Sequence, residues 1–241
     1  MTIICLIGPS GSGKTTLAEA LVPTGIDTIR SYTTRPMRPG EQQGREHIFI
    51  DEQDAHRLLA TQRPMAYTLF GGYRYFALWS QLMLRSVSAQ SLDPSNPRPI
   101  ESSAHLISYV IDEHGYHTLL AQVLSLQNEL KQDYHIELPP ITLLPIRIER
   151  SEEALTATID PARLARDADR TDTAHIPYRI TIHNDAPTAT DLTAWAQTQL
   201  SPALRMWLSH GKPAITRNTP TTHLSASMGI AEIIAHLNGA L

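Results

Sequence analysis

The chain lacks several features that would assign it to a special class of protein. It holds one cysteine, Cys5, among 241 residues, so no disulfide can form within one chain. Its formal net charge of −4 gives no overall basic field that would attract nucleic acid. No apolar run approaches ~18 residues, and no charged segment precedes the first apolar run, so we expect neither a membrane span nor a secretory signal. With an ordinary hydrophobic fraction of 41%, these absences predict a cytoplasmic globular protein without membrane or nucleic-acid partners.

The first chemical signal is a glycine-rich loop between an apolar run and a helical pattern. Residues 8–15, Gly-Pro-Ser-Gly-Ser-Gly-Lys-Thr, fit the pattern G-x-x-x-x-G-K-[ST] of a phosphate-binding P-loop. We expect a buried strand at 2–7 before the loop and a helix at 16–22 after it. In that setting, backbone N–H groups and the helix N-terminus surround an anion, Lys14 reaches the β- and γ-phosphates, and the Thr15 hydroxyl ligates Mg²⁺. A chance match is the alternative, and the strand and the helix argue against it.

A second motif lies at residues 31–44. Two arginines three residues apart, Arg35 and Arg38, occupy a loop that also carries hydroxyl side chains. This arrangement suits a phosphate monoester, because guanidinium forks bind its oxygens in paired hydrogen bonds. A solvated basic loop is the alternative, and charge alone would favour it.

Together, the two motifs resemble the guanylate kinase family, whose members read S-x-T-T-R-x-x-R-x-G-E-x-x-G where this chain has residues 31–44. The similarity continues at residues 111–115, 163–167 and 182–185. It implies an α/β fold, a three-layer α/β/α P-loop kinase with a mostly parallel core sheet, a small α+β acceptor-binding insertion and a lid. The implied boundaries are a guanylate-kinase-like domain at 1–200 (core 1–30, 78–149 and 171–200; insertion 31–77; lid 150–170) and a C-terminal extension at 201–241.

The resemblance also implies roles for single residues on the donor side. Lys14, Arg35, Arg163 and Arg166 would be catalytic, and Thr15 and Asp112 would hold Mg²⁺ as the cofactor. For Asp112 a helix N-cap is the alternative, for the lid arginines a solvated helix face, and for Asn184 a turn residue. The implied ATP-binding residues are Gly8, Ser10, Gly11, Ser12, Gly13, Lys14, Thr15, Thr16 and Asn184.

On the acceptor side, the resemblance implies a phosphate site with some altered positions. Its residues would be Ser31, Arg35, Arg38, Glu41, His47, Tyr75 and Asp112. Counting without gaps from Arg35, the family tyrosine on the acceptor phosphate falls on His47, which can still donate a hydrogen bond. The family glutamate and serine that contact the base fall on Ala66 and Ala77, and the first aspartate of its D-x-D falls on Val110. An apolar wall discriminates between bases weakly, so the sequence specifies the acceptor phosphate better than the base.

Elsewhere, apolar runs predict strands at 26–30, 105–111, 141–146 and 178–183 and a core helix at 189–200. Within the insertion we expect a strand at 47–50, a helix capped by Asp51 and a hairpin around Gly71-Gly72. We expect loops at 91–100 and 211–226. A terminal helix at 227–240 carries an apolar face that either packs on the domain, which we favour, or contacts a second copy in a homodimer.

These observations predict a nucleoside monophosphate kinase-like transferase that uses ATP, with GMP or dGMP as the leading acceptor. One alternative is a kinase of the same fold that acts on another nucleotide or a sugar phosphate. Tyr67, Tyr73 or Glu101 could then replace the lost base contacts. The other alternative is a non-catalytic guanylate-kinase-like binding module, which the intact Gly8, Gly13, Lys14 and Thr15 disfavour.

Overall fold

The computed structural model describes residues 1–82, 106–133, 135, 141–156, 176–209 and 221–239. The chain divides into two compact units. The larger unit comprises residues 2–28, 106–113 and 142–241, and the smaller unit comprises Met1 and residues 29–105 and 114–141. The expected loop at 91–100 and most of the expected lid at 150–170 lie outside the described residues.

The larger unit is built on a six-stranded sheet with the strand order β10-β9-β8-β1-β7-β2. The pairs from β7 through β1, β8 and β9 to β10 are parallel. The strands are β1 (Thr2–Ile7), β2 (Asp27–Ile29), β7 (Leu106–Val110), β8 (Thr142–Glu149), β9 (Ile180–His183) and β10 (Thr222–Ser225). This arrangement confirms the α/β class with a mostly parallel core sheet.

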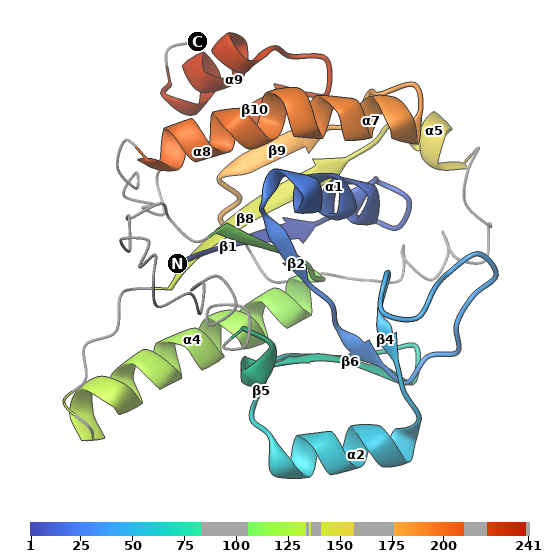
Figure 1. Ribbon diagram of the computed structural model, residues 1–241, viewed down its shortest axis with the longest axis vertical. Coiled ribbons are helices and arrows are strands. Elements are labelled where there is room, and N and C mark those ends of the chain that lie inside the picture. The colour runs from blue at the N-terminus through green and yellow to red at the C-terminus, as the bar shows by residue number, and fades with distance from the viewer. Residues whose placement is uncertain (83–105, 134, 136–140, 157–175, 210–220, 240–241) are drawn as a thin grey trace, which may run out of the picture. The chain divides into compact units, whose positions relative to one another are not determined.

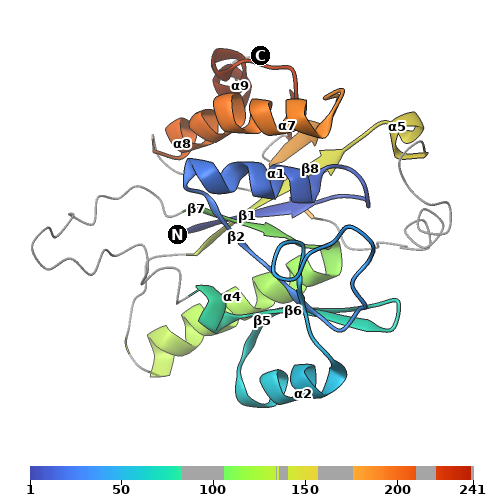
Figure 2. The same cartoon turned by 45° about the vertical axis from the view of Figure 1, so that its right-hand side comes forward.

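The helices of this unit follow its strands. They are α1 (Lys14–Leu21), a 3₁₀ turn η1 (Val22–Thr24), α5 (Glu152–Thr156), α7 (Ala189–Trp195), a π-helical turn η2 (Ala196–Leu200), α8 (Ser201–Ser209) and α9 (Ile230–Leu237). Helices α1, α7 and α8 run beside the sheet, and α9 packs against α8 (Figures 1 and 2). No helix within the described ranges combines the length and the apolar character that crossing a membrane requires.

Strand β1 is the centre of the core. All six of its residues are buried, since β8 covers one edge and β7 the other. A strand that is buried on both faces reads as a continuous apolar run, which is why the sequence predicts β1 at its observed bounds. Cys5 lies in this strand, where burial raises the pKa of its thiol and makes it a packing residue rather than a nucleophile.

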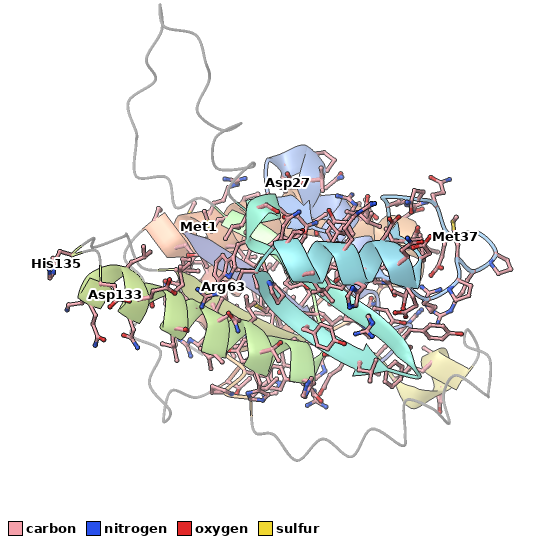
Figure 3. The ribbon with its side chains drawn as sticks, turned by 90° about the horizontal axis from the view of Figure 1, so that it is seen from below. Met1, Asp27, Met37, Arg63, Asp133 and His135 are labelled. Atoms are coloured by element: carbon pink, nitrogen blue, oxygen red, sulfur yellow. The ribbon has the colours of Figure 1, made fainter. Side chains whose placement is uncertain are left out.

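The smaller unit holds a four-stranded sheet with the order β4-β3-β6-β5. Its elements are β3 (Tyr32–Thr33), β4 (Ile48–Phe49), α2 (Glu52–Thr61), β5 (Pro64–Phe70), β6 (Tyr73–Leu78) and α4 (Glu113–Asp133), of which all but Glu113 belongs here. Asp51 caps α2 by accepting a hydrogen bond from the Asp54 amide, as expected. Arg63 joins the start of β5 to α4 through Gln122, Ser125 and Glu129 (Figure 3).

Two expectations for the C-terminal region are wrong. The core helix does not stop at residue 200, because η2 connects α7 to α8 and extends the helical stretch to Ser209. Pro202 suggested a helix end, but a proline is tolerated in the first turn of a new helix, where its missing N–H has no partner. Residues 222–225, expected in a loop, form β10, a short edge strand whose only fully buried side chain is Leu224. Strand β8 also continues to Glu149, past its expected end at 146.

Helix α9 packs on its own chain. Ile233 and Leu237 are buried against α8, η2 and β10. The Trp195 indole N–H donates to the Met228 carbonyl, and the Ile230 amide donates to the Gln199 side chain. The apolar face of the terminal helix is therefore covered by the larger unit, as the favoured interpretation predicts.

We predict that Ile233→Ala lowers the free energy of unfolding by about 2–5 kcal/mol, because it leaves a cavity in a fully buried site. Urea denaturation monitored by circular dichroism measures this. Met206→Ala on α8, where the side chain is 46% exposed, serves as the control and should change stability by less than about 0.5 kcal/mol. Equal effects of the two substitutions would show that α9 is not part of the core.

Candidate nucleotide-binding site

The P-loop lies between β1 and α1, and two of its glycines have no room for a side chain. A Cβ on Gly8, whose φ is 153°, would lie 2.2 Å from the Ile148 carbonyl oxygen on β8. A Cβ on Gly13, whose φ is 101°, would lie 2.5 Å from the Asn184 amide nitrogen. The loop therefore packs directly on the ends of β8 and β9, and only glycine permits this approach.

The polar residues of the loop surround its concave side. The Lys14 ammonium donates to the carbonyls of Gly8 and Pro9 at 2.8 and 2.6 Å, so it lies over the loop. Thr15 is exposed in the first turn of α1, and Thr16 is half-buried. The Ser12 side chain is buried, and its hydroxyl has no hydrogen-bond partner among the described residues. With the α1 N-terminus, this geometry is that of an anion-binding loop.

Asn184 supports the P-loop from behind. Its side-chain amide donates to the Ser12 carbonyl at 2.8 Å, and its backbone N–H donates to the Glu149 carbonyl at 2.8 Å. Asn184 is 7% exposed. The sequence predicted a contact between this residue and adenine, which stays a prediction, and missed its support of the loop, because pairing across 172 positions leaves no local signal.

The candidate metal ligands lie at the same edge of the sheet. Asp112 follows β7, and Thr15 follows β1; because these strands are parallel neighbours, their carboxyl ends meet at one edge. A hydroxyl and a carboxylate are the hard oxygen ligands that Mg²⁺ prefers beside phosphate oxygens. Among the described residues, no three His, Cys, Asp or Glu side chains cluster as a metal site, which fits an ion that is bound largely through its nucleotide. Arg163 and Arg166 lie outside the described residues.

In the smaller unit, the second motif forms an arginine cluster (Arg35, Arg38, Glu41, His47 and Tyr75). The Arg35 guanidinium donates through both terminal nitrogens to the Glu41 carboxylate, each at 2.9 Å. Glu41 also accepts from the Arg38 amide at 2.8 Å, and the Arg38 side chain approaches it at 4.0 Å. Arg35 is 7% exposed, whereas Arg38 is 39% exposed. The motif is therefore a folded, charge-paired loop, not a solvated one.

The charges of the cluster are set by burial and by one another. Burial opposes the charge of Arg35 and Glu41, but the hydrogen bonds and attraction between them prevail, so the pKa of Arg35 is raised and that of Glu41 is lowered. Burial, and then the charge of Arg35, lower the pKa of His47 to about 4. The His47 ring meets the rings of Tyr75 and Phe49 edge-on, and its Nδ1 has no hydrogen-bond partner within the described part of the chain. At neutral pH His47 is therefore an uncharged imidazole that can donate one hydrogen bond.

Two cluster contacts were missed by the sequence analysis. The Arg35 guanidinium lies 5.3 Å from the centre of the Phe49 ring, and the buried Thr33 hydroxyl accepts a hydrogen bond from the Arg35 amide. Alternation along the short strands β3 and β4 is the only sequence signal for either contact. Ser31, the remaining predicted acceptor residue, is buried just before β3, and its carbonyl accepts from the Ile48 amide.

The two alanines that replace polar family positions face each other. Ala66 of β5 pairs with Ala77 of β6, and both are buried. The neighbouring pair on the same face of the sheet is Thr68 and Tyr75, because alternate residues of a strand share a face. The altered positions therefore adjoin Tyr75 of the arginine cluster.

Tyr67 cannot replace the lost base contacts from where it lies. It pairs with Phe76 on the opposite face, and its hydroxyl accepts a hydrogen bond from Arg74. Tyr73 shares the face of Tyr75 but lies at the hairpin end, and Glu101 lies outside the described residues.

A P-loop at the carboxyl edge of a mostly parallel sheet defines the P-loop class of α/β nucleotide-binding proteins. The family model described as guanylate kinase matches residues 1–90, which contain both the P-loop and the arginine cluster. Residues 1–90 of the chain belong to the guanylate kinase family.

Individual relatives agree with this assignment over short stretches. The chain is 52% identical over 50 residues to the guanylate kinase of Nitrobacter winogradskyi, a stretch that covers 20% of this chain and 23% of that protein. It is 36% identical over 75 residues to the guanylate kinase of Dechloromonas aromatica, covering 30% and 37%. The chain thus spans well under half the length of these curated relatives.

A solved structure extends the likeness of fold beyond these stretches. The crystal structure of guanylate kinase from Anaplasma phagocytophilum matches 85% of this chain and 85% of its own, with a TM-score of 0.51 and 20% sequence identity. At that identity the match concerns the fold alone.

We predict that His47 makes stability fall as the pH drops from about 6.5 to 4. The unfolded chain takes up a proton in this range and the folded chain does not, because the pKa of His47 is lowered to about 4. His47→Gln should remove up to about 2 kcal/mol of the stability difference between pH 7 and pH 5, measured by urea unfolding. His56→Gln, an exposed position on α2, is the control and should keep the wild-type pH dependence. Identical pH dependence in both variants would contradict the assignment.

Proposed function

We propose that the protein transfers the γ-phosphoryl group of ATP to a nucleoside monophosphate, with GMP or dGMP as the leading acceptor. The observation that supports this most is the pairing of two phosphate-binding devices in one chain. A P-loop alone would suit an ATPase, whereas a second, arginine-based site suits a phosphate-bearing acceptor.

In this proposal, the loop N–H groups and Lys14 bind the β- and γ-phosphates of the donor, and Ser10, Gly11 and Thr16 complete the cradle. Asn184 would also contact the adenine side. Arg35, Arg38, His47, Tyr75 and Ser31 bind the acceptor phosphate, while Glu41 keeps the two arginines in place. Positioning and charge neutralisation then account for most of the rate acceleration, because phosphoryl transfer needs little covalent help from the protein.

The proposal includes further assignments of the sequence. Mg²⁺, held by Thr15 and Asp112, would bridge the phosphates and neutralise developing charge. Arg163 and Arg166 of the lid at 150–170 would stabilise the transferring group, the insertion at 31–77 would bind the acceptor, and residues 201–241 would be an extension of the core. A cytoplasmic location, the absence of nucleic-acid and membrane partners, and a homodimer stay predictions.

A kinase with a different or broader acceptor range is the second candidate. The observation that favours it is the buried Ala66–Ala77 pair, which offers no side-chain hydrogen bond where the family reads its base. A site without such groups discriminates between similar ligands only weakly.

We predict that Lys14→Ala lowers kcat by about 10²- to 10³-fold, because it removes the cation that reaches the transferred phosphate. A coupled ADP-release assay with GMP measures this, and an unchanged circular dichroism spectrum shows that the fold is intact. Lys131→Ala, an exposed lysine on α4, is the matched control and should keep wild-type turnover. Normal turnover by Lys14→Ala would overturn the proposed kinase activity.

We predict that an acceptor panel of GMP, dGMP, AMP, CMP, UMP, dTMP and sugar phosphates shows highest kcat/KM with GMP or dGMP. The preference over AMP should be only about 10- to 200-fold, as expected for a site without polar base contacts. A preference above about 10⁴-fold would show that other residues read the base. Best turnover with another acceptor would favour the second candidate.

A further inference from the structure

The C-terminal strand β10 contacts the turn that follows β9. The Ser225 hydroxyl donates a short hydrogen bond to the Asp185 carboxylate, and the Ser227 hydroxyl lies 3.5 Å from the same oxygen. The two serine hydroxyls are 2.6 Å apart, and the Ser227 amide donates to the Ser225 hydroxyl. The Ala226 amide donates to the His183 carbonyl. Strand β10 thus fixes both the backbone and the carboxylate of this turn.

The same turn carries Asn184, which holds the P-loop. Its amide must present nitrogen, not oxygen, to the Ser12 carbonyl, because only the nitrogen can donate. In a trans peptide the C=O and the next N–H point in opposite directions. A Ser12 carbonyl held toward Asn184 therefore aims the Gly13 N–H away from it, toward the inside of the loop where an anion binds.

The contacts form a continuous path from the end of the chain to the P-loop. Its steps are Ser225 and Ser227 to Asp185, Asp185 to its neighbour Asn184, and Asn184 to Ser12. Residues 222–227 lie far outside residues 1–90, over which the family model matches. This support of the loop is therefore not part of the matched segment.

We propose that Ser225 and Ser227 are positioning residues for donor binding, which orient the Asn184 amide and through it the P-loop N–H groups. The proposal rests on ATP being the donor, as in the proposed function. It does not depend on which acceptor is used, because the acceptor residues belong to a different set of contacts.

The test is ATP binding by the full chain, measured by isothermal titration calorimetry with Mg²⁺ present. The double substitution Ser225→Ala with Ser227→Ala should raise the Kd for ATP about three- to tenfold. The KM for GMP and the unfolding midpoint should stay near wild type, because Asp185 is exposed and its contacts add little stability. Ser225→Thr in the Ser227→Ala background keeps a hydroxyl and should restore most of the affinity.

Two further variants frame the result. Asn184→Asp, which removes the donated hydrogen bond, should weaken ATP binding more than the double substitution does. Ser209→Ala, which removes a hydroxyl that donates to Met206 within α8, should leave the Kd unchanged. An unchanged Kd for ATP in the double variant, or a lowered unfolding midpoint with unchanged Kd, would overturn the proposal.

The outcomes separate this proposal from the proposed function. If the wild type binds ATP but phosphorylates no acceptor, the kinase assignment fails and the calorimetric comparison still decides the role of the serines. If the wild type binds no ATP, the P-loop assignment and the positioning role both fail.

Discussion

The rest of the larger unit depends on how closely the P-loop approaches its neighbours. The loop backbone lies where a single added carbon on Gly8 would collide with the Ile148 carbonyl, and one on Gly13 with the Asn184 amide. This proximity requires β1 to lie beside β8, and the turn after β9 to reach under the loop. The buried β1 supplies the rigid support, since it cannot shift without disturbing both neighbouring strands. The anion-binding geometry is thus a consequence of sheet order as much as of the glycine pattern.

In the smaller unit, one ion pair has the corresponding role. The Arg35–Glu41 pair is largely buried, and loss of either partner would leave the other charge without compensation. The pair closes the loop between β3 and β4 and fixes the charge environment of His47. Imidazole in place of the family tyrosine keeps a polar edge against Tyr75, while the alanine pair beside it leaves the adjoining surface apolar. The part of this face that suits a phosphate and the part that would meet a base therefore differ in chemistry.

Local signals predicted much of this. The apolar run of β1, the Asp51 cap of α2 and the Gly71-Gly72 hairpin each depend on neighbours in the sequence, and each was found as expected. The features that were missed depend on distant partners: β10 is a strand only because β9 lies beside it, and Asn184 supports Ser12 across the sheet. The helix extension past Pro202 was missed because a π-helical turn absorbs the break that proline usually causes. The resemblance of residues 31–44 to a family located the arginine cluster, but only the structure shows that Glu41 pairs with both arginines.

The C-terminal strand also changes how the sheet ends. Strands β10 and β2 are its two edges, with four and three residues, whereas β1 has six and β8 has eight. An edge strand exposes unpaired backbone N–H and C=O groups that can recruit a strand from another molecule. Short edges offer few such groups. The long, apolar strands that carry the P-loop are thereby kept inside the sheet, which protects them from edge-to-edge aggregation.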